Sequence, residues 1–206
     1  MNTKKFLPLT AVALAAGLTL AGCSTNTPGS SATSTPGTVR GNMGSSTAFA
    51  STAPASEHYS ADAIFAQMMI PHHAQAVEMS EMILKKQDIP PNVSALATRI
   101  KDAQGPEIEK MTGWLKAWNE PTMMAGGHSM DGMMSADDMP RLEAAQGVEA
   151  AKLFLTQMVA HHQGAVTMAK TETTDGKNPD AVQLAKDIVA AQEAEIKEMQ
   201  QLLTTL

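Results

Sequence analysis

The stretch FAQMMIPHHAQAVEMS, residues 65–80, returns later in the chain as FLTQMVAHHQGAVTMA, residues 154–169. A shift of 89 positions brings a phenylalanine, two methionines and two adjacent histidines into register. The matched pairs are Phe65 and Phe154, Met69 and Met158, His72 and His161, His73 and His162, and Met79 and Met168. Because so many matches fall in one short window, the repeat indicates a duplicated structural element.

A second repeat follows each copy. QGPEIEKM, residues 104–111, matches QEAEIKEM, residues 192–199, at a shift of 88, so the loop of the first hairpin is one residue longer. In all four segments the apolar residues recur at helical spacing. Two helical hairpins that each expose an apolar face bury it by packing together. We therefore predict an all-α fold for residues 57–206, a four-helix bundle made of two repeated hairpins at about 60–119 and 141–206.

Helix ends are indicated by capping residues and prolines. The expected ranges are about 60–86, 91–120, 147–174 and 179 almost to 206. Ser60 and Asn178 are the predicted N-caps, and Pro91 and Pro179 suit the first helical position. Capping residues and prolines close to these helix ends in the sequence thus explain where the helices begin.

Two prolines break the symmetry of the repeats. Pro71 and Pro106 lie inside the helices of the first copy, where the second has Ala160 and Ala194. A proline inside a helix costs about 3 kcal/mol unless the helix kinks or restarts. We expect a bend or a local irregularity at both prolines.

The N-terminus has the pattern of an export signal. Lys4 and Lys5 precede the apolar run LTAVALAAGLTL, residues 9–20, which is too short for a membrane-spanning helix. The run leads into Leu-Ala-Gly-Cys at 20–23, which resembles a bacterial lipobox. This predicts a signal peptide at 1–22, lipidation of Cys23 and an extracytoplasmic protein anchored to a bacterial membrane. An ordinary secretory signal and an uncleaved anchor are the alternatives.

Residues 23–56 are mostly Ser, Thr, Pro, Gly and Ala, which predicts a disordered tether. The whole chain has 206 residues and a formal net charge of −6. It has no basic stripe, so nucleic acid is not an expected partner. Cys23 is the only cysteine, which excludes a disulfide within one chain. Stability must therefore come from packing.

The repeated histidines and methionines are candidate metal ligands. Imidazole suits copper, zinc, iron and nickel, whereas thioether sulfur selects soft ions such as Cu(I). At about 100° per residue His72 shares an inward arc with Met69 and Met79, while His73 faces a neighbouring helix. The candidate ligands are His72, His73, His161, His162, Met69, Met79, Met158 and Met168. The alternative is a methionine-packed core with hydrogen-bonded histidines.

The partner helices carry a second set of repeated polar residues and methionines. Its members are Gln104, Glu107, Met111, Gln192, Glu195 and Met199. They are predicted to orient the imidazoles through hydrogen bonds. A solvated edge of an amphipathic helix is the alternative for these polar residues.

The linker at 120–140 holds six methionines and one histidine. Such residues can wrap a soft ion without a preformed site, which predicts a secondary metal site. Its members are Met123, Met124, His128, Met130, Met133 and Met134, with Met139 nearby. A disordered linker is the alternative. Ser135 is a candidate cap for a short helix at about 136–145.

The twin M-x-x-H-H motifs, each followed by Q-x-x-E-I-x-x-M, resemble the bacterial domain of unknown function 305 family over about residues 57–206. The resemblance implies a ferritin-like four-helix bundle that is exported, and some family members are associated with copper binding and copper tolerance. Pro106, inside the first Q-x-x-E, departs from an exact repeat.

The leading functional hypothesis is an extracytoplasmic copper protein that buffers, sequesters or transfers Cu(I), with Cu(II) as a further candidate at the histidines. Copper donor or acceptor proteins are the expected partners, and no organic cofactor is expected. The alternatives are a metal-free interaction module, a methionine sink for oxidants, and a metal-dependent redox enzyme. A di-iron oxidase needs Glu-x-x-His motifs, which this chain lacks, so no enzymatic activity is expected. The oligomeric state is left open.

Overall fold

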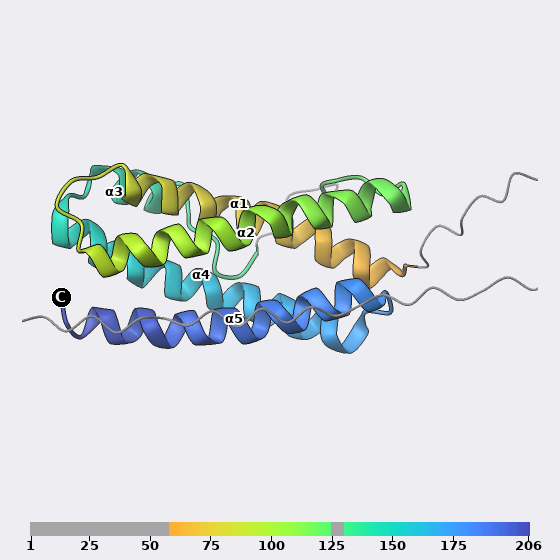
Figure 1. Ribbon diagram of the computed structural model, residues 1–206. Coiled ribbons are helices and arrows are strands. Elements are labelled where there is room, and N and C mark those ends of the chain that lie inside the picture. The colour runs from red at the N-terminus through yellow and green to blue at the C-terminus, as the bar shows by residue number, and fades with distance from the viewer. Residues whose placement is uncertain (1–57, 125–129) are drawn as a thin grey trace, which may run out of the picture. The chain divides into compact units, whose positions relative to one another are not determined.

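The computed structural model describes residues 58–124 and 130–206, and this part of the chain is helical without a strand. The helices are α1 (Ser60–Leu84), α2 (Pro91–Trp118), α3 (Asp138–Ala144), α4 (Gly147–Asp175) and α5 (Pro179–Leu203). Figure 1 shows α1 beside α2 and α4 beside α5, as two long hairpins packed into a bundle. The predicted all-α fold is confirmed. The predicted signal peptide and tether lie outside the described residues.

The helix ends agree closely with the expected caps, with small corrections. Asn178 is the N-cap of α5, and its side chain accepts hydrogen bonds from the backbone N–H groups of Asp180 and Ala181. The N-cap of α1 is Tyr59, one residue before the predicted Ser60. The Tyr59 N–H donates to the Asp62 carboxylate at 2.7 Å, so the acidic residue of the first turn supplies the capping acceptor.

Both interior prolines lie within unbroken helices. α1 continues through Pro71 and α2 through Pro106, and the bend or local irregularity expected at each proline stays a prediction. Pro106 is exposed, and Pro71 is followed by two fully buried histidines. Tertiary packing of the flanking turns therefore holds each helix together despite one missing hydrogen bond.

The bundle core has two apolar halves with the histidines between them. One half contains Ala76 and Met79 of α1 with Phe154 and Met158 of α4. The other contains residues on the opposite side of the histidines in both helices, such as Met69 in α1 and Ala165 in α4. The paired histidines therefore form a polar layer across the middle of an otherwise apolar core.

The short helix α3 covers one end of the groove between α1 and α4. Leu142 of α3 is fully buried in the core half that contains Met79. The Gln157 amide donates to the Asp138 carbonyl at 3.2 Å. The predicted short helix is confirmed, although it begins at Asp138 instead of 136. The N-cap of α3 is Asp137 and not the predicted Ser135, although the Ser135 Oγ still accepts the Asp138 N–H at 3.2 Å.

No helix in the described ranges, 58–124 and 130–206, is long and apolar enough to cross a membrane.

Candidate metal centre

Four histidines and two glutamines gather in the middle of the bundle, and we call this group the histidine layer. Its members are His72, His73, Gln104, His161, His162 and Gln192. The four histidines are completely buried, and the two glutamines are 2% and 3% exposed. Burying this many polar groups in an apolar core is costly unless they have partners. The layer is therefore the part of the core that packing alone does not explain.

His72 of α1 and His161 of α4 face each other at the centre of the layer. Their ring centroids are 3.8 Å apart and the rings are tilted by 40°. Burial, reinforced by the nearby His73 imidazole, lowers the pKa of His72 to about 4. Burial and the His72 imidazole lower the pKa of His161 to about 2. Both rings are therefore neutral at physiological pH, and each keeps an unprotonated nitrogen.

The other two histidines each pair with a carboxylate from the partner helix of their own hairpin. His73 Nε2 lies 2.8 Å from Glu107 in α2, and His162 Nε2 lies 2.8 Å from Glu195 in α5. The glutamates are half-buried, with 23% and 19% of their side chains exposed. The helical spacing predicted this division, in which His72 points inward and His73 faces a neighbouring helix.

The partners of three histidines determine which ring nitrogen carries the proton. A carboxylate and a carbonyl can only accept hydrogen bonds, so Nε2 must be the donor in His73 and His162, and also in His72, which donates to the Asp131 carbonyl at 3.2 Å. Their Nδ1 atoms are buried and have no hydrogen-bond partner. Each therefore presents a buried lone pair, as a metal-binding imidazole does when a carboxylate or carbonyl holds its other nitrogen.

The glutamines of the layer also have unsatisfied polar atoms. Both amide atoms of Gln104 and the amide oxygen of Gln192 are buried without a hydrogen-bond partner. The alternative of a solvated helix edge is wrong for these two residues, because they lie in the core. Most of the buried side-chain N and O atoms that lack a hydrogen-bond partner in the described residues thus belong to the layer.

The repeated methionines flank the layer on both sides. Met69 and Met158 lie one turn before the central histidines in α1 and α4, and Met111 and Met199 lie one turn after the paired glutamates. All four are fully buried. The remaining predicted methionine ligands, Met79 and Met168, lie six or seven residues beyond the histidines, about two helical turns away.

The donors restrict which ions the layer can hold. In the described residues no three side chains of the His, Cys, Asp and Glu classes are grouped for one metal ion. The side chains in and beside the layer supply imidazole and thioether donors, and soft ions such as Cu(I) accept both together.

Part of the linker lies directly over the central histidines, and we call residues 131–134 the strap. Besides the bond from His72 to the Asp131 carbonyl, the Gln75 side chain makes two hydrogen bonds with the Met134 backbone, at 2.7 and 3.1 Å. Gly132 has a φ of 83°, and a Cβ built there would lie 2.6 Å from the Ala160 carbonyl oxygen. The strap therefore needs glycine to approach α4.

Sequence reasoning missed three residues that hold the strap. Gly164 of α4 has no room for a Cβ, which would lie 1.8 Å from the Asp131 carbonyl oxygen. Gly164 aligns with Gln75 at the shift of 89. Gln75 in the first copy therefore binds the strap, whereas Gly164 at the equivalent position of the second copy leaves room for it. This departure from the repeat, together with Gly132 in the linker, was the only available signal.

The linker methionines in the described residues differ in exposure. Met123 is 71% exposed, and Met124, Met130, Met133 and Met134 are half-buried. His128 lies outside the described residues. The secondary metal site therefore stays a prediction.

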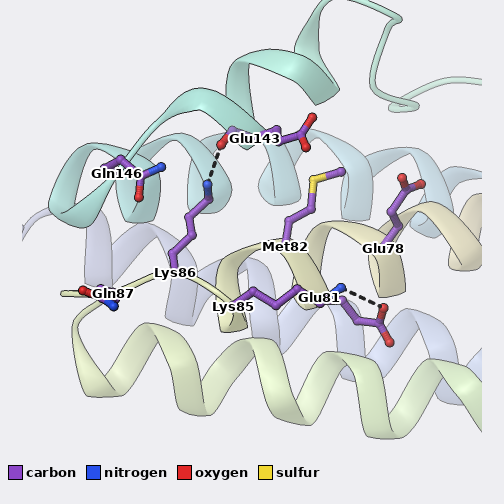
Figure 2. A pocket seen from close by; sticks show the side chains of 8 residues that line it. All are labelled: Glu78, Glu81, Met82, Lys85, Lys86, Gln87, Glu143 and Gln146. Carbon is purple, nitrogen blue, oxygen red and sulfur yellow. Dashed lines mark hydrogen bonds and ion pairs between the residues drawn. The ribbon is translucent and has the colours of Figure 1, made fainter.

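A separate cavity of about 580 Å³ lies where the end of α1 meets α3 (Figure 2). Most of its lining is charged or amide side chains, and Lys86 reaches across it to donate to the Glu143 carbonyl at 2.7 Å. It contains none of the predicted ligands. The buried layer, and not this surface hollow, is the candidate centre.

Comparisons with solved structures show similar bundles. A DUF305 protein from Streptomyces coelicolor, provisionally named as secreted, is 35% identical with a TM-score of 0.67, over 70% of this chain and 93% of that one. A DUF305 fragment from Deinococcus radiodurans is 30% identical with a TM-score of 0.66, over 72% and 99%. CopM in its Cu(II)-bound form is 36% identical with a TM-score of 0.61, over 70% and 96%. CopM has also been solved with Cu(I) and with silver.

One curated protein, the uncharacterized protein L153 of Acanthamoeba polyphaga mimivirus, is 42% identical over 52 residues, which cover 25% of this chain. The match spans about a third of that relative's length, 34%. The model of the domain of unknown function DUF305 matches residues 62–203, nearly the whole bundle. The twin histidine motifs and the duplicated hairpins thus belong to one recognised domain, and this chain is a member of the DUF305 family.

Proposed function

We propose that this protein binds copper in the histidine layer and buffers, sequesters or transfers it outside the cytoplasm. The observation that carries the proposal is the pair of imidazoles at His73 and His162, each held at Nε2 by a glutamate and each with a buried, unpartnered Nδ1. Outer hydrogen bonds of this kind orient metal-binding histidines and raise their basicity. A packing motif alone gives no reason for such lone pairs.

Copper is favoured by the neighbouring donors and by the relatives. Met69 and Met158 stand one turn from His72 and His161, so the layer joins imidazole with thioether, a combination suited to Cu(I). Imidazole alone also suits Cu(II). CopM, which shares the fold at more than 30% identity, has been solved with copper in both oxidation states and with silver.

Titration of the purified chain against a chromogenic Cu(I) chelator tests the proposal. Wild type is expected to withdraw copper from the chelator, and the quadruple variant His72→Ala, His73→Ala, His161→Ala, His162→Ala is expected to lose most of this competition. Circular dichroism checks that the variant remains helical. If a folded quadruple variant competes as well as wild type, the layer is not the copper site.

The export part of the proposal rests on the lipobox-like residues before Cys23 and on the relative named as secreted. Metabolic labelling with a radioactive fatty acid should mark the wild-type chain and not Cys23→Ser. Label in the variant, or none in wild type, would remove the anchor from the proposal without affecting copper binding.

We also propose a binding role without catalysis, because the chain lacks the Glu-x-x-His motif of di-iron bundles. Copper-dependent oxygen consumption by the loaded protein would contradict this. If purified protein neither contains copper nor gains thermal stability from it, the metal-free module or the methionine sink becomes the better hypothesis.

A further inference from the structure

The two ends of the groove between α1 and α4 are related by the duplication, but α3 covers only one of them. At the covered end, Leu142 of α3 is fully buried, and Met139 and Ala145 pack against the same core half. Two residues separate the end of α3 at Ala144 from Gly147, where α4 begins. The segment immediately preceding the second copy thus folds back to cover the groove.

The equivalent place at the other end is a pocket of about 230 Å³, which we call the open groove. It is lined by Ala61, Ile64, Phe65 and Met68 of α1 and by Met168, Thr171, Glu172 and Asp175 of α4. The shift of 89 relates Phe65 to Phe154 and Met168 to Met79, which belong to the core half that α3 covers. The open groove is therefore the counterpart of the α3 binding surface.

Residue exposure shows that, among the described residues, this end is less covered than the end beside α3. Ile64 is 41% exposed, whereas its counterpart Leu153 is half-buried and packed against the core. Met168 is half-buried, whereas Met79 is fully buried. The same apolar positions are thus more exposed to solvent at the end without α3. Covering them would stabilise the fold through the hydrophobic effect.

The chain offers a matching segment at the matching place. Subtracting 89 from the bounds of α3, 138–144, gives residues 49–55, FASTAPA, which end four residues short of α1. Phe49 is the only large apolar residue between Met43 and Tyr59. Phe49 lies ten positions before Tyr59, enough to span about 30 Å when extended. The connection therefore leaves Phe49 free to reach a groove that begins at Ala61.

We propose that residues 49–55 dock in the open groove, with the Phe49 side chain between Met68 and Met168, as the counterpart of α3. Thioethers make favourable contacts with aromatic rings. The groove is smaller than the roughly 300–1,000 Å³ of small-molecule pockets, which suits a side chain better than a separate ligand. Covalent attachment gives the segment a high effective concentration at the groove. The tether would then end near residue 48, and this inference does not depend on copper.

Amide hydrogen exchange tests the docking. The exported chain from residue 23, with Cys23→Ser so that neither lipid nor detergent competes for the groove, is compared with the same chain carrying Phe49→Ala. The amides of residues 64–68 and 168–172 should exchange roughly fivefold faster in the variant, which corresponds to about 1 kcal/mol of lost protection. Val39→Ala, which removes an apolar side chain elsewhere in the tether, should change nothing.

Equal exchange in Phe49→Ala and wild type would overturn the proposal. Protection that increases with protein concentration, together with a dimer in sedimentation analysis, would also overturn it by identifying a second copy as the cover. Met68→Ala supplies a second reading: combined with Phe49→Ala it should add little further loss, because both changes remove the same contact. Fully additive losses would contradict the contact.

Discussion

At the scale of single residues, the central point is how identical side chains acquire different environments. Adjacent histidines on one helix point about 100° apart, so each pair divides between the centre of the bundle and the partner helix. His72 meets His161, whereas His73 meets Glu107. The pattern of duplicated histidines was readable from the sequence, but the choice of partner for each ring depends on how the hairpins pack.

The glutamates are expected to hold the imidazoles for metal binding. Glu107→Gln combined with Glu195→Gln should weaken Cu(I) affinity about 10- to 100-fold, because the neutral amide orients the ring less firmly and lowers its basicity. Competition titration measures the change. Glu109→Gln, on the exposed face of α2, is the matched control and should bind like wild type. Unchanged affinity in the double variant would assign the glutamates a purely structural role.

Copper binding should persist into acid solution. Burial lowers the pKa of His72 to about 4 and that of His161 to about 2, so protons compete with the metal at these rings only well below the usual imidazole range. Titration at pH 7 and pH 5 should give Cu(I) affinities that differ less than for a histidine peptide of ordinary pKa. A loss of binding near pH 6.5 would show that unperturbed imidazoles hold the ion.

Glu172, near the open groove, should make stability depend on pH. Burial, with the neighbouring Asp62 carboxylate, raises the pKa of Glu172 to about 8. The folded state therefore keeps a proton that the unfolded chain releases above about 4.5, and its contribution to stability is lost as pH rises from there to about 8. The stability gained by Glu172→Gln over wild type should grow across that range and then level. Exposed Glu149→Gln should show no such trend in urea unfolding.

At the scale of elements, helices followed the expected pattern more faithfully than the linker did. Helix ranges are local properties, set by caps such as Asn178 and by apolar spacing, so the sequence predicted them within a few residues. The prolines were judged by local propensity alone, and both α1 and α2 continue through them as single helices. The strap was unpredictable because its hydrogen bonds join residues about 60 positions apart.

A side chain added to α4 beneath the strap should displace the strap and destabilise the fold. Gly164→Ala places a Cβ onto the Asp131 carbonyl, so the strap must move, and we expect a loss of about 1–3 kcal/mol of unfolding free energy. Gly113→Ala, an exposed glycine of α2 with nothing within 4 Å, should instead stabilise by about 0.5–1 kcal/mol. Chemical unfolding of both variants measures the contrast. A neutral Gly164→Ala would mean that the strap does not rest on α4.

At the scale of the whole molecule, the histidine layer buries polar groups in the middle of the core, and their desolvation lowers the stability of the fold. Bound copper would offset this cost by supplying partners to buried lone pairs, so metal should stabilise the fold. At free copper one hundred times the dissociation constant, linkage contributes about 2.7 kcal/mol, or a rise of roughly 5–10 °C in melting temperature. Differential scanning fluorimetry measures it. The quadruple histidine variant should show no such rise.

Residue spacing and duplication alone determined the helices, the two hairpins and the identity of the histidine, glutamate and methionine sets, because those features repeat along the chain at fixed periods. Only the tertiary structure decided that His72 faces His161, that Gln104 is buried, and that the strap lies over the central histidines. These contacts join segments far apart in sequence, and they arise where the two copies differ, as at Gln75 and Gly164. A repeat in the sequence predicts the features that the two copies share, whereas the contacts made by residues that differ between the copies depend on tertiary packing.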